Sequence, residues 1–287
     1  MSKFLVVTAD DYGLSVEVNA AVELAHLNGI LTAASLMVSG PAAQDAIRRA
    51  RTLPRLAVGL HLVLVDGMPT LPRDKIPDLV DSFGFFRKDM AKMGLEIAVR
   101  PRVRTQLRNE IVAQFQAFLA TGLPPDHIDV HKHYHLHPLV AAEIICLGRT
   151  FGFSSLRVPC EPSIVLNRIG QGLTSPSRIL SPCLAHLKRQ ARRAGFLFAD
   201  ATFGWAWSGA LSEERMIAIL SQRPVGSLTE IYFHPAARDD FDGHAAGYNY
   251  RAELEVLLSP RVAATLEQRG YCLTTYPEFR RQRCRPT

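Results

Sequence analysis

The sequence is poor in cysteine, and the few cysteines it has are not arranged for cross-linking. Its 287 residues include five cysteines, an odd number, and no two of them form a C-x-x-C pair. A disulfide framework or a structural zinc site is therefore not expected. The chain also lacks a run of about 18 consecutive apolar residues, so no transmembrane helix is predicted.

A leader sequence and several common catalytic loops are missing as well. The first apolar run is short and is followed at once by Asp10 and Asp11, unlike a secretory signal peptide, so we expect a cytoplasmic protein. No G-x-G-x-x-G loop follows a predicted strand, and neither G-x-x-x-x-G-K-[ST] nor G-x-S-x-G occurs. These absences leave dinucleotide-binding, P-loop and serine-hydrolase chemistry without support.

The composition is that of a globular protein with a mild positive charge. Hydrophobic residues make up 47% of the chain and charged residues 21%, which supplies enough apolar side chain for a core. The 33 Lys and Arg against 27 Asp and Glu give a net charge of +6, which favours nucleic acid, an anionic membrane surface or an acidic substrate as partner. Basic runs at 188–193 and 280–285 are typical of solvated faces and would also suit anionic lipid head groups.

Short apolar runs alternate with segments of helical period along the chain. The predicted strands cover residues 4–8, 33–38, 57–64, 127–130, 155–158, 228–233 and 271–275. One predicted helix begins after the capping residue Ser15 and ends before Gly29, and another spans 106–120 with apolar residues on one stripe. This alternation predicts an α/β protein with a mainly parallel sheet. Stretches at about 65–101 and 160–209 interrupt it, and we interpret them as insertions in one domain, residues 1–287.

Residues suited to metal binding or proton transfer follow four of the predicted strands. Asp10 and Asp11 end the first strand, His61 lies near the end of the third, and His131 and His234 directly follow two later strands. In parallel α/β folds the chemistry sits at the carboxyl ends of the strands. One of the paired carboxylates can bind a cation while its neighbour accepts a proton from water, although Asp and Gly here are also a turn signal.

Five of the ten histidines lie between residues 127 and 137. On an extended segment, Asp129, His131, His133 and His135 would share one face. Neutral imidazole is a common ligand for transition metals. A polar strand end with hydrogen-bonded histidines is the alternative, but packing alone does not require so many titratable rings, and the cluster favours a metal site.

Taken together, these motifs resemble the YdjC-like carbohydrate deacetylases, the family of the chitooligosaccharide deacetylases. TADDYGLS at 8–15, GLH at 59–61, D-x-H-x-H-x-H at 129–135 and HP at 234–235 occur in the order of that family, and the resemblance extends from about residue 3 to 276. Residues 29–38 and 59–66 look most like its hopanoid-biosynthesis-associated branch (HpnK). That branch is associated with removal of the acetyl group from N-acetylglucosaminyl-bacteriohopanetetrol.

The resemblance implies an irregular (β/α) barrel of mainly parallel strands, similar to the polysaccharide deacetylases, with one divalent metal ion. Zn²⁺ and Mg²⁺ are both candidates, and manganese or cobalt would also suit such ligands. The residues matched by motif are these: metal ligands Asp11, His61 and His131; catalytic base Asp10 and acid His234; and outer ligand shell or substrate pocket His133 and His135. In the expected mechanism, the metal and a backbone N–H near Tyr12 stabilise the oxyanion.

The expected activity is removal of acetyl from an N-acetylglucosaminyl sugar, with a hopanoid glycolipid as the expected substrate. Trp205 and Trp207 would shelter its apolar part, unless they are core residues, and the enzyme would lie in the cytoplasm, in peripheral contact with the inner membrane face. A soluble chitooligosaccharide deacetylase and another metal hydrolase, such as a phosphoesterase, are the alternatives. A binding module for nucleic acid or membrane is the non-enzymatic reading, which the paired aspartates and separated histidines do not favour, and we expect no nucleic-acid partner.

Overall fold

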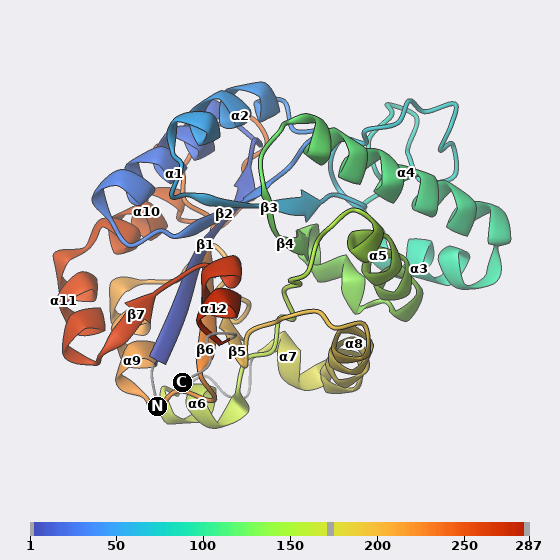
Figure 1. Ribbon diagram of the computed structural model, residues 1–287. Coiled ribbons are helices and arrows are strands. Elements are labelled where there is room, and N and C mark those ends of the chain that lie inside the picture. The colour runs from blue at the N-terminus through green and yellow to red at the C-terminus, as the bar shows by residue number, and fades with distance from the viewer. Residues whose placement is uncertain (1–2, 171–174, 284–287) are drawn as a thin grey trace.

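The computed structural model describes residues 3–170 and 175–283 and shows a curled parallel sheet surrounded by helices (Figure 1). The sheet runs in the order β4-β3-β2-β1-β6-β5, with β7 also paired to β1, and each of these pairs is parallel. The strands in this part of the chain are β1 (Lys3–Tyr12), β2 (Ala33–Leu36), β3 (Ala57–Leu62), β4 (Pro125–Val130), β5 (Ala201–Phe203), β6 (Leu228–Phe233) and β7 (Tyr271–Leu273).

Helices follow most of the strands and cover the sheet. They are α1 (Val16–Asn28), α2 (Ala43–Thr52), α3 (Met90–Val99), α4 (Pro101–Ala120), the 3-10 helix η1 (His131–Leu136), α5 (Pro138–Thr150), α6 (Ser163–Arg168), α7 (Pro176–Ile179), α8 (Ser181–Arg193), α9 (Glu213–Ser221), α10 (Tyr250–Leu258), α11 (Pro260–Gln268) and α12 (Tyr276–Arg283). Within the described ranges, none of these helices is both long and apolar enough to cross a membrane.

The sheet continues only irregularly beyond β4. Two isolated parallel bridges, Ile128 to Leu156 and Ser155 to Leu197, continue the sheet beyond β4. The strand predicted at 155–158 is thus wrong as a regular element, because only these bridges form there. The expectation of an irregular barrel of mainly parallel strands is confirmed, since the curled sheet is bonded in parallel throughout its path.

Local sequence signals account for much of this architecture. Ser15 caps α1 by accepting the Val18 N–H at 3.2 Å, and the helix ends before Gly29 as predicted. A Cβ atom on Gly29 would lie 2.2 Å from the Leu257 carbonyl oxygen, so this close approach requires glycine. The apolar stripe of α4 is buried against the core, and its members are Leu107, Ile111, Phe115 and Phe118.

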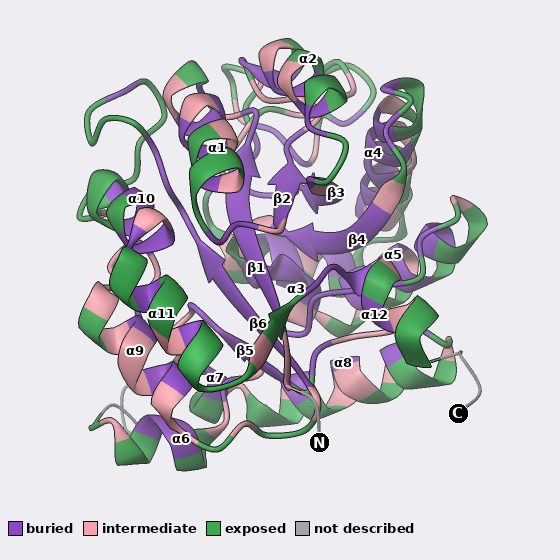
Figure 2. Cartoon of the chain, turned by 60° about the vertical axis from the view of Figure 1, so that its left-hand side comes forward, coloured by how far each residue is buried: buried purple, intermediate pink, exposed green. Residues whose placement is uncertain are grey.

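The carboxyl ends of the strands form one buried rim. Figure 2 shows that the central strands are buried while the outward faces of the surrounding helices are exposed. A parallel sheet covered on its faces in this way needs near-continuous apolar strands, and all six residues of β6 are buried.

The two stretches that interrupt the predicted alternation take different forms. Stretch 65–101 forms loops and α3, and stretch 160–209 forms α6, α7, α8 and β5. Residues 171–174 of that second stretch and the last two residues of the basic run 280–285 lie outside the described residues.

Candidate active site

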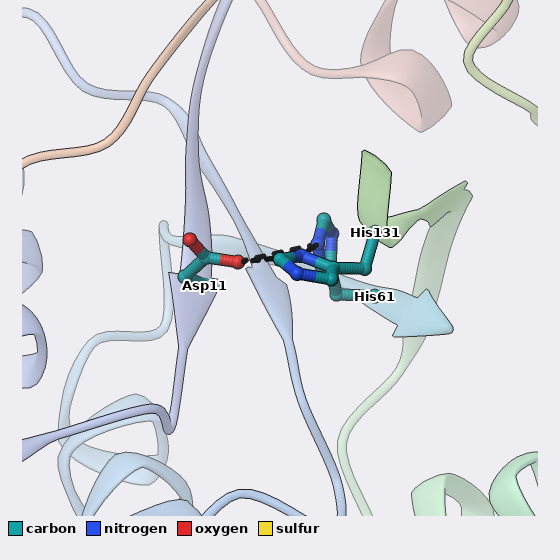
Figure 3. A group of neighbouring side chains, drawn as sticks. All are labelled: Asp11, His61 and His131. Atoms are coloured by element: carbon teal, nitrogen blue, oxygen red, sulfur yellow. Dashed lines mark hydrogen bonds and ion pairs between the residues drawn. The ribbon is translucent and has the colours of Figure 1, made fainter. Parts of the chain in front are cut away.

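Three side chains from separate strand ends converge on one point. Asp11 lies near the end of β1, His61 in β3, and His131 directly after β4. Asp11 Oδ1 lies 3.3 Å from His61 Nε2 and 3.3 Å from His131 Nδ1, and the two nitrogens are 3.4 Å apart (Figure 3). We call these residues the Asp-His-His triad.

The triad fits a divalent metal ion. A tetrahedral ion with bonds of about 2.0–2.1 Å separates its ligand atoms by about 3.3–3.4 Å, which matches the three distances between the triad atoms. Asp11 Oδ1 is buried and accepts no hydrogen bond from the described part of the chain. One carboxylate oxygen and two imidazole nitrogens form a donor set that suits zinc, manganese or cobalt.

A buried carboxylate orients the His61 ring. Asp129 Oδ1 lies 2.9 Å from His61 Nδ1, and both residues are buried. The Nδ1 proton therefore points to Asp129, and the Nε2 lone pair is left for the triad. Carboxylate partners of this kind fix the tautomer and raise the basicity of a metal-binding histidine. The sequence grouped Asp129 with the histidines but assigned it no role, and the structure places it against His61.

No sequence motif pointed to Arg157, which is fully buried. Its Nη1 lies 2.5 Å from Asp10 Oδ2 and 2.6 Å from Asp129 Oδ2, and its Nε lies 3.0 Å from Glu230 Oε1. The guanidinium also lies 4.4 Å from the ring centroid of Tyr232. One cation thus contacts three buried carboxylates, which would be still more costly to bury without it.

Asp10 is held with one oxygen bonded and the other free. Its Oδ2 accepts from Arg157, whereas its Oδ1 is buried and has no hydrogen-bond partner in the ranges described. Burial raises the pKa of Asp10 to about 7, the Arg157 charge opposes that rise, and the Asp129 charge adds to it. A carboxylate with a free oxygen and a pKa near neutrality is suited to accept a proton.

His234 directly follows β6 and lines the cleft that also contains the Asp-His-His triad. Its backbone N–H donates to Glu253 Oε2, and its Nδ1 lies 3.9 Å from the same oxygen. The ring packs edge-on against Tyr248, with centroids 5.1 Å apart. Burial lowers the pKa of His234, and the carboxylates of Asp11 and Glu253 oppose that change.

The histidine segment is not extended, so the prediction that its members share one face is wrong. After His131 the chain forms η1, and Lys132 and His133 adopt left-handed φ values of +53° and +52°. This turn separates the histidines. His133 Nε2 lies 2.8 Å from the Tyr232 hydroxyl, and His135 Nε2 donates to the Arg157 carbonyl oxygen at 3.0 Å. Burial holds the pKa of His133 well below its usual range.

The three residues Tyr12, Trp205 and Trp207, which were expected to contact the substrate or lie close to it, differ in whether they line the cleft. The Tyr12 side chain is fully buried and donates to the Ala46 carbonyl at 2.7 Å, so it points into the core and away from the cleft. The backbone N–H groups of the next two residues donate within the protein, Gly13 to Asn19 Oδ1 and Leu14 to the Asp11 carbonyl oxygen. Neither is therefore free to donate to an oxyanion, as was expected of a backbone N–H near Tyr12. Trp207 is 5% exposed and packs in the core, so its expected contact with substrate is wrong, whereas Trp205 lines the cleft.

The cleft above the triad has a volume of about 1020 Å³. That volume is at the upper end of the range for small-molecule sites, which is about 300–1,000 Å³. Its floor carries the Asp-His-His triad and Asp10, and its walls combine aromatic and apolar side chains with a few charges. Lining side chains away from the floor include Met68, Phe85, Lys132, Trp205 and Tyr248.

Comparisons with known proteins agree on one family. The model of the YdjC-like protein family matches residues 4–268. A carbohydrate deacetylase of Geobacillus stearothermophilus is 31% identical over 97% of this chain and 99% of its own length, and a chitooligosaccharide deacetylase of Serratia marcescens is 29% identical over 97% and 100%. A crystal structure from Enterococcus faecalis V583, named for cleavage of cellobiose-phosphate, superposes with a TM-score of 0.76 at 27% identity and covers 96% of this chain and 98% of that one. The chain therefore belongs to the YdjC-like family.

Proposed function

We propose that this protein is a metal-dependent carbohydrate deacetylase that hydrolyses the acetamide of an N-acetylated amino sugar, as in chitooligosaccharides. One observation carries the proposal: the triad atoms converge at 3.3–3.4 Å from one another on the floor of the cleft, beside a carboxylate with a free oxygen. The carbohydrate deacetylases that match this chain over nearly its whole length support the choice of substrate class.

Asp11, His61 and His131 would hold the ion, and Asp129 would orient His61 for it. When bound, a divalent ion acts as a Lewis acid that lowers the pKa of water and polarises a carbonyl group. Asp129 and Arg157 are almost fully enclosed, so they keep the ligand rings and the neighbouring carboxylates in place without taking part in bond breaking.

Asp10 is the proton acceptor in this proposal. Arg157 fixes its Oδ2, so that Oδ1 is left to take a proton from the attacking water. The water oxygen forms a bond to the acetamide carbon, and the C–N bond then breaks to release acetate and the amine. His234, at the carboxyl end of the neighbouring strand β6, gives the departing nitrogen its proton. Its lowered pKa makes the protonated ring a strong donor.

The test is Asp10→Asn, assayed by acetate release from N-acetylated chitooligosaccharides. We expect acetate release to fall by at least about 100-fold, the contribution of one general base, while the bound metal measured by elemental analysis stays near one ion per chain. Asp242→Asn is the matched control, because Asp242 lines the same cleft but is solvent-exposed. An Asp10→Asn enzyme that retains activity would remove Asp10 from the mechanism. A wild-type enzyme that cleaves aryl phosphates but no acetamide would make the protein a phosphoesterase.

A glycolipid such as N-acetylglucosaminyl-bacteriohopanetetrol is the second candidate substrate. It is favoured by apolar side chains on the cleft wall that remain open to solvent, Met68 at 42% and Phe85 at 48% exposed. A lipid-linked substrate would be turned over with a higher kcat/KM than soluble chitobiose, and binding of the enzyme to anionic vesicles would accompany it. Equal kcat/KM values for both substrates would leave the soluble oligosaccharide as the substrate.

A further inference from the structure

We propose that Glu161 is a positioning residue that holds Trp205 as one wall of the substrate cleft; this rests on the proposed deacetylase function. Glu161 is 5% exposed and lies in the stretch between α5 and α6. Its Oε1 accepts the backbone N–H groups of Gly204, Trp205 and Ala206 at 3.2, 3.0 and 3.0 Å, and its Oε2 accepts that of Ala206 at 3.1 Å. Three successive N–H groups thus converge on one carboxylate.

This arrangement is an anion-binding turn whose anion is supplied by the chain itself. Successive backbone N–H groups that point into one concavity favour a negative charge. β5 ends at Phe203, and Gly204 then turns the chain with a φ of +136°, where a Cβ atom would lie 2.7 Å from the Tyr232 carbonyl oxygen. A side chain donates to Glu161 as well: the Ser175 hydroxyl donates to Oε2. The geometry therefore requires the ionised carboxylate.

The turn presents Trp205 to the cleft. The Trp205 ring lies edge-on to His133 with centroids 4.9 Å apart, and both side chains line the cleft that contains the Asp-His-His triad. His133 in turn contacts the Tyr232 hydroxyl at 2.8 Å. Aromatic rings present an electron-rich face, and the C–H bonds on one side of a pyranose ring can pack against such a face. Trp205 is therefore placed to receive a sugar ring.

Glu161 also joins two separate segments of the chain into that wall. Through Ser175 it is bonded to the start of α7, whose first residue, Pro176, lines the cleft beside Trp205. Without the carboxylate, the N–H groups at 204–206 lose their common acceptor, and nothing else in the described chain accepts from them at this turn. The consequence falls on the substrate wall and not on the triad, which Glu161 does not contact.

The test is a double-mutant cycle on KM. We expect Trp205→Ala to raise KM for N-acetylated chitooligosaccharides by about tenfold, and Glu161→Ala to raise it by a similar factor, with kcat within about threefold of wild type. Adding Glu161→Ala to Trp205→Ala should then change KM by less than about twofold, because both act through one ring. Zinc affinity, measured by competition with a chelator, should be unchanged in all three variants. Additive effects on KM, a loss of kcat without a change in KM, or weakened zinc binding would each overturn the proposal.

Fluorescence tests the same idea without any substrate. The chain has two tryptophans, so the difference from Trp205→Phe isolates the Trp205 emission. Glu161→Gln keeps the side-chain shape and one acceptor oxygen, and it serves if Glu161→Ala does not fold. We expect acrylamide to quench Trp205 more strongly in Glu161→Gln than in wild type. Asp200→Asn is the matched control, because Asp200 also accepts two backbone N–H groups, those of Ser227 and Leu228, but does not line the cleft.

Equal quenching of Trp205 in wild type and Glu161→Gln would refute the role of Glu161 in positioning. If the wild-type enzyme released no acetate, the proposed function would fail, yet the quenching result would still decide whether Glu161 holds Trp205. The two failures are therefore distinguishable.

Discussion

Replacing His127 by glutamine is expected to change how the stability of the protein depends on pH. His127 is fully buried. The Ser35 hydroxyl donates its single proton to Asp129 Oδ2 at 2.8 Å, so His127 Nε2, 2.9 Å from the Ser35 oxygen, has to be a donor. His127 Nδ1 lies 2.8 Å from Asp126 Oδ2, which accepts. The ring therefore carries both protons and is an imidazolium.

The sign of the pH dependence follows from the raised pKa of His127. Burial by itself would lower the pKa of His127, but Asp126 and Asp129 raise it above the usual value of 6.5. Between 6.5 and the higher native pKa, the folded protein holds one proton more than the unfolded chain. The free energy of unfolding therefore falls as pH rises through this window, by about 1.4 kcal/mol per pH unit, and the contribution is fully present below pH 6.5.

Urea unfolding of the metal-free protein at several pH values measures this slope. His127→Gln leaves Asp126 buried without its cation, which costs about 3–5 kcal/mol when such a pair is broken. The gap between wild type and variant should be largest near pH 6 and should narrow as pH rises. His186→Gln is the control, because His186 lies on α8 and its side chain is bonded only to Arg189 among the described residues. Parallel stability curves for wild type and His127→Gln would show that His127 is neutral and would refute the proton count.

Two further predictions concern the metal site and the core. Asp129→Asn should weaken zinc binding by about 10–100-fold, because the amide no longer fixes the His61 tautomer as the carboxylate does. Competition with a chelator measures the zinc affinity. An affinity equal to that of wild type would mean that Asp129 does not orient His61. Phe115→Ala should lower the free energy of unfolding by about 3–5 kcal/mol, since Phe115 is 0% exposed. Leu95→Ala, 64% exposed on α3, should change it by less than about 0.5 kcal/mol in the same urea titration, and similar losses for both would contradict the packing described for α4.

Local signals predicted most of the elements that position the site. The limits of α1 and of β6 agree with the expected ranges, because a capping serine, a terminal glycine and a short β-branched run act on neighbouring residues. The sequence also singled out Asp11, His61 and His131, which the structure brings together. Strand ends of a parallel sheet share one rim, so residues far apart in the chain could be placed near one another before any contact was known.

Other features had no signature in the chain. Arg157 follows no motif, and only its three carboxylate partners, contributed by different strands, reveal its place. Trp205 and Trp207 are two residues apart and looked equivalent, yet one lines the cleft and the other packs in the core.

The order of residues along this chain was sufficient for the class of fold and for expecting Asp11, His61 and His131 near one another, because periodicity, caps and strand ends are short-range properties. The surroundings that distinguish the buried carboxylates came from folding alone. Asp10, Asp129, Glu161 and Glu230 are chemically similar, and their roles differ only through the donors, cations and burial that distant segments impose on each.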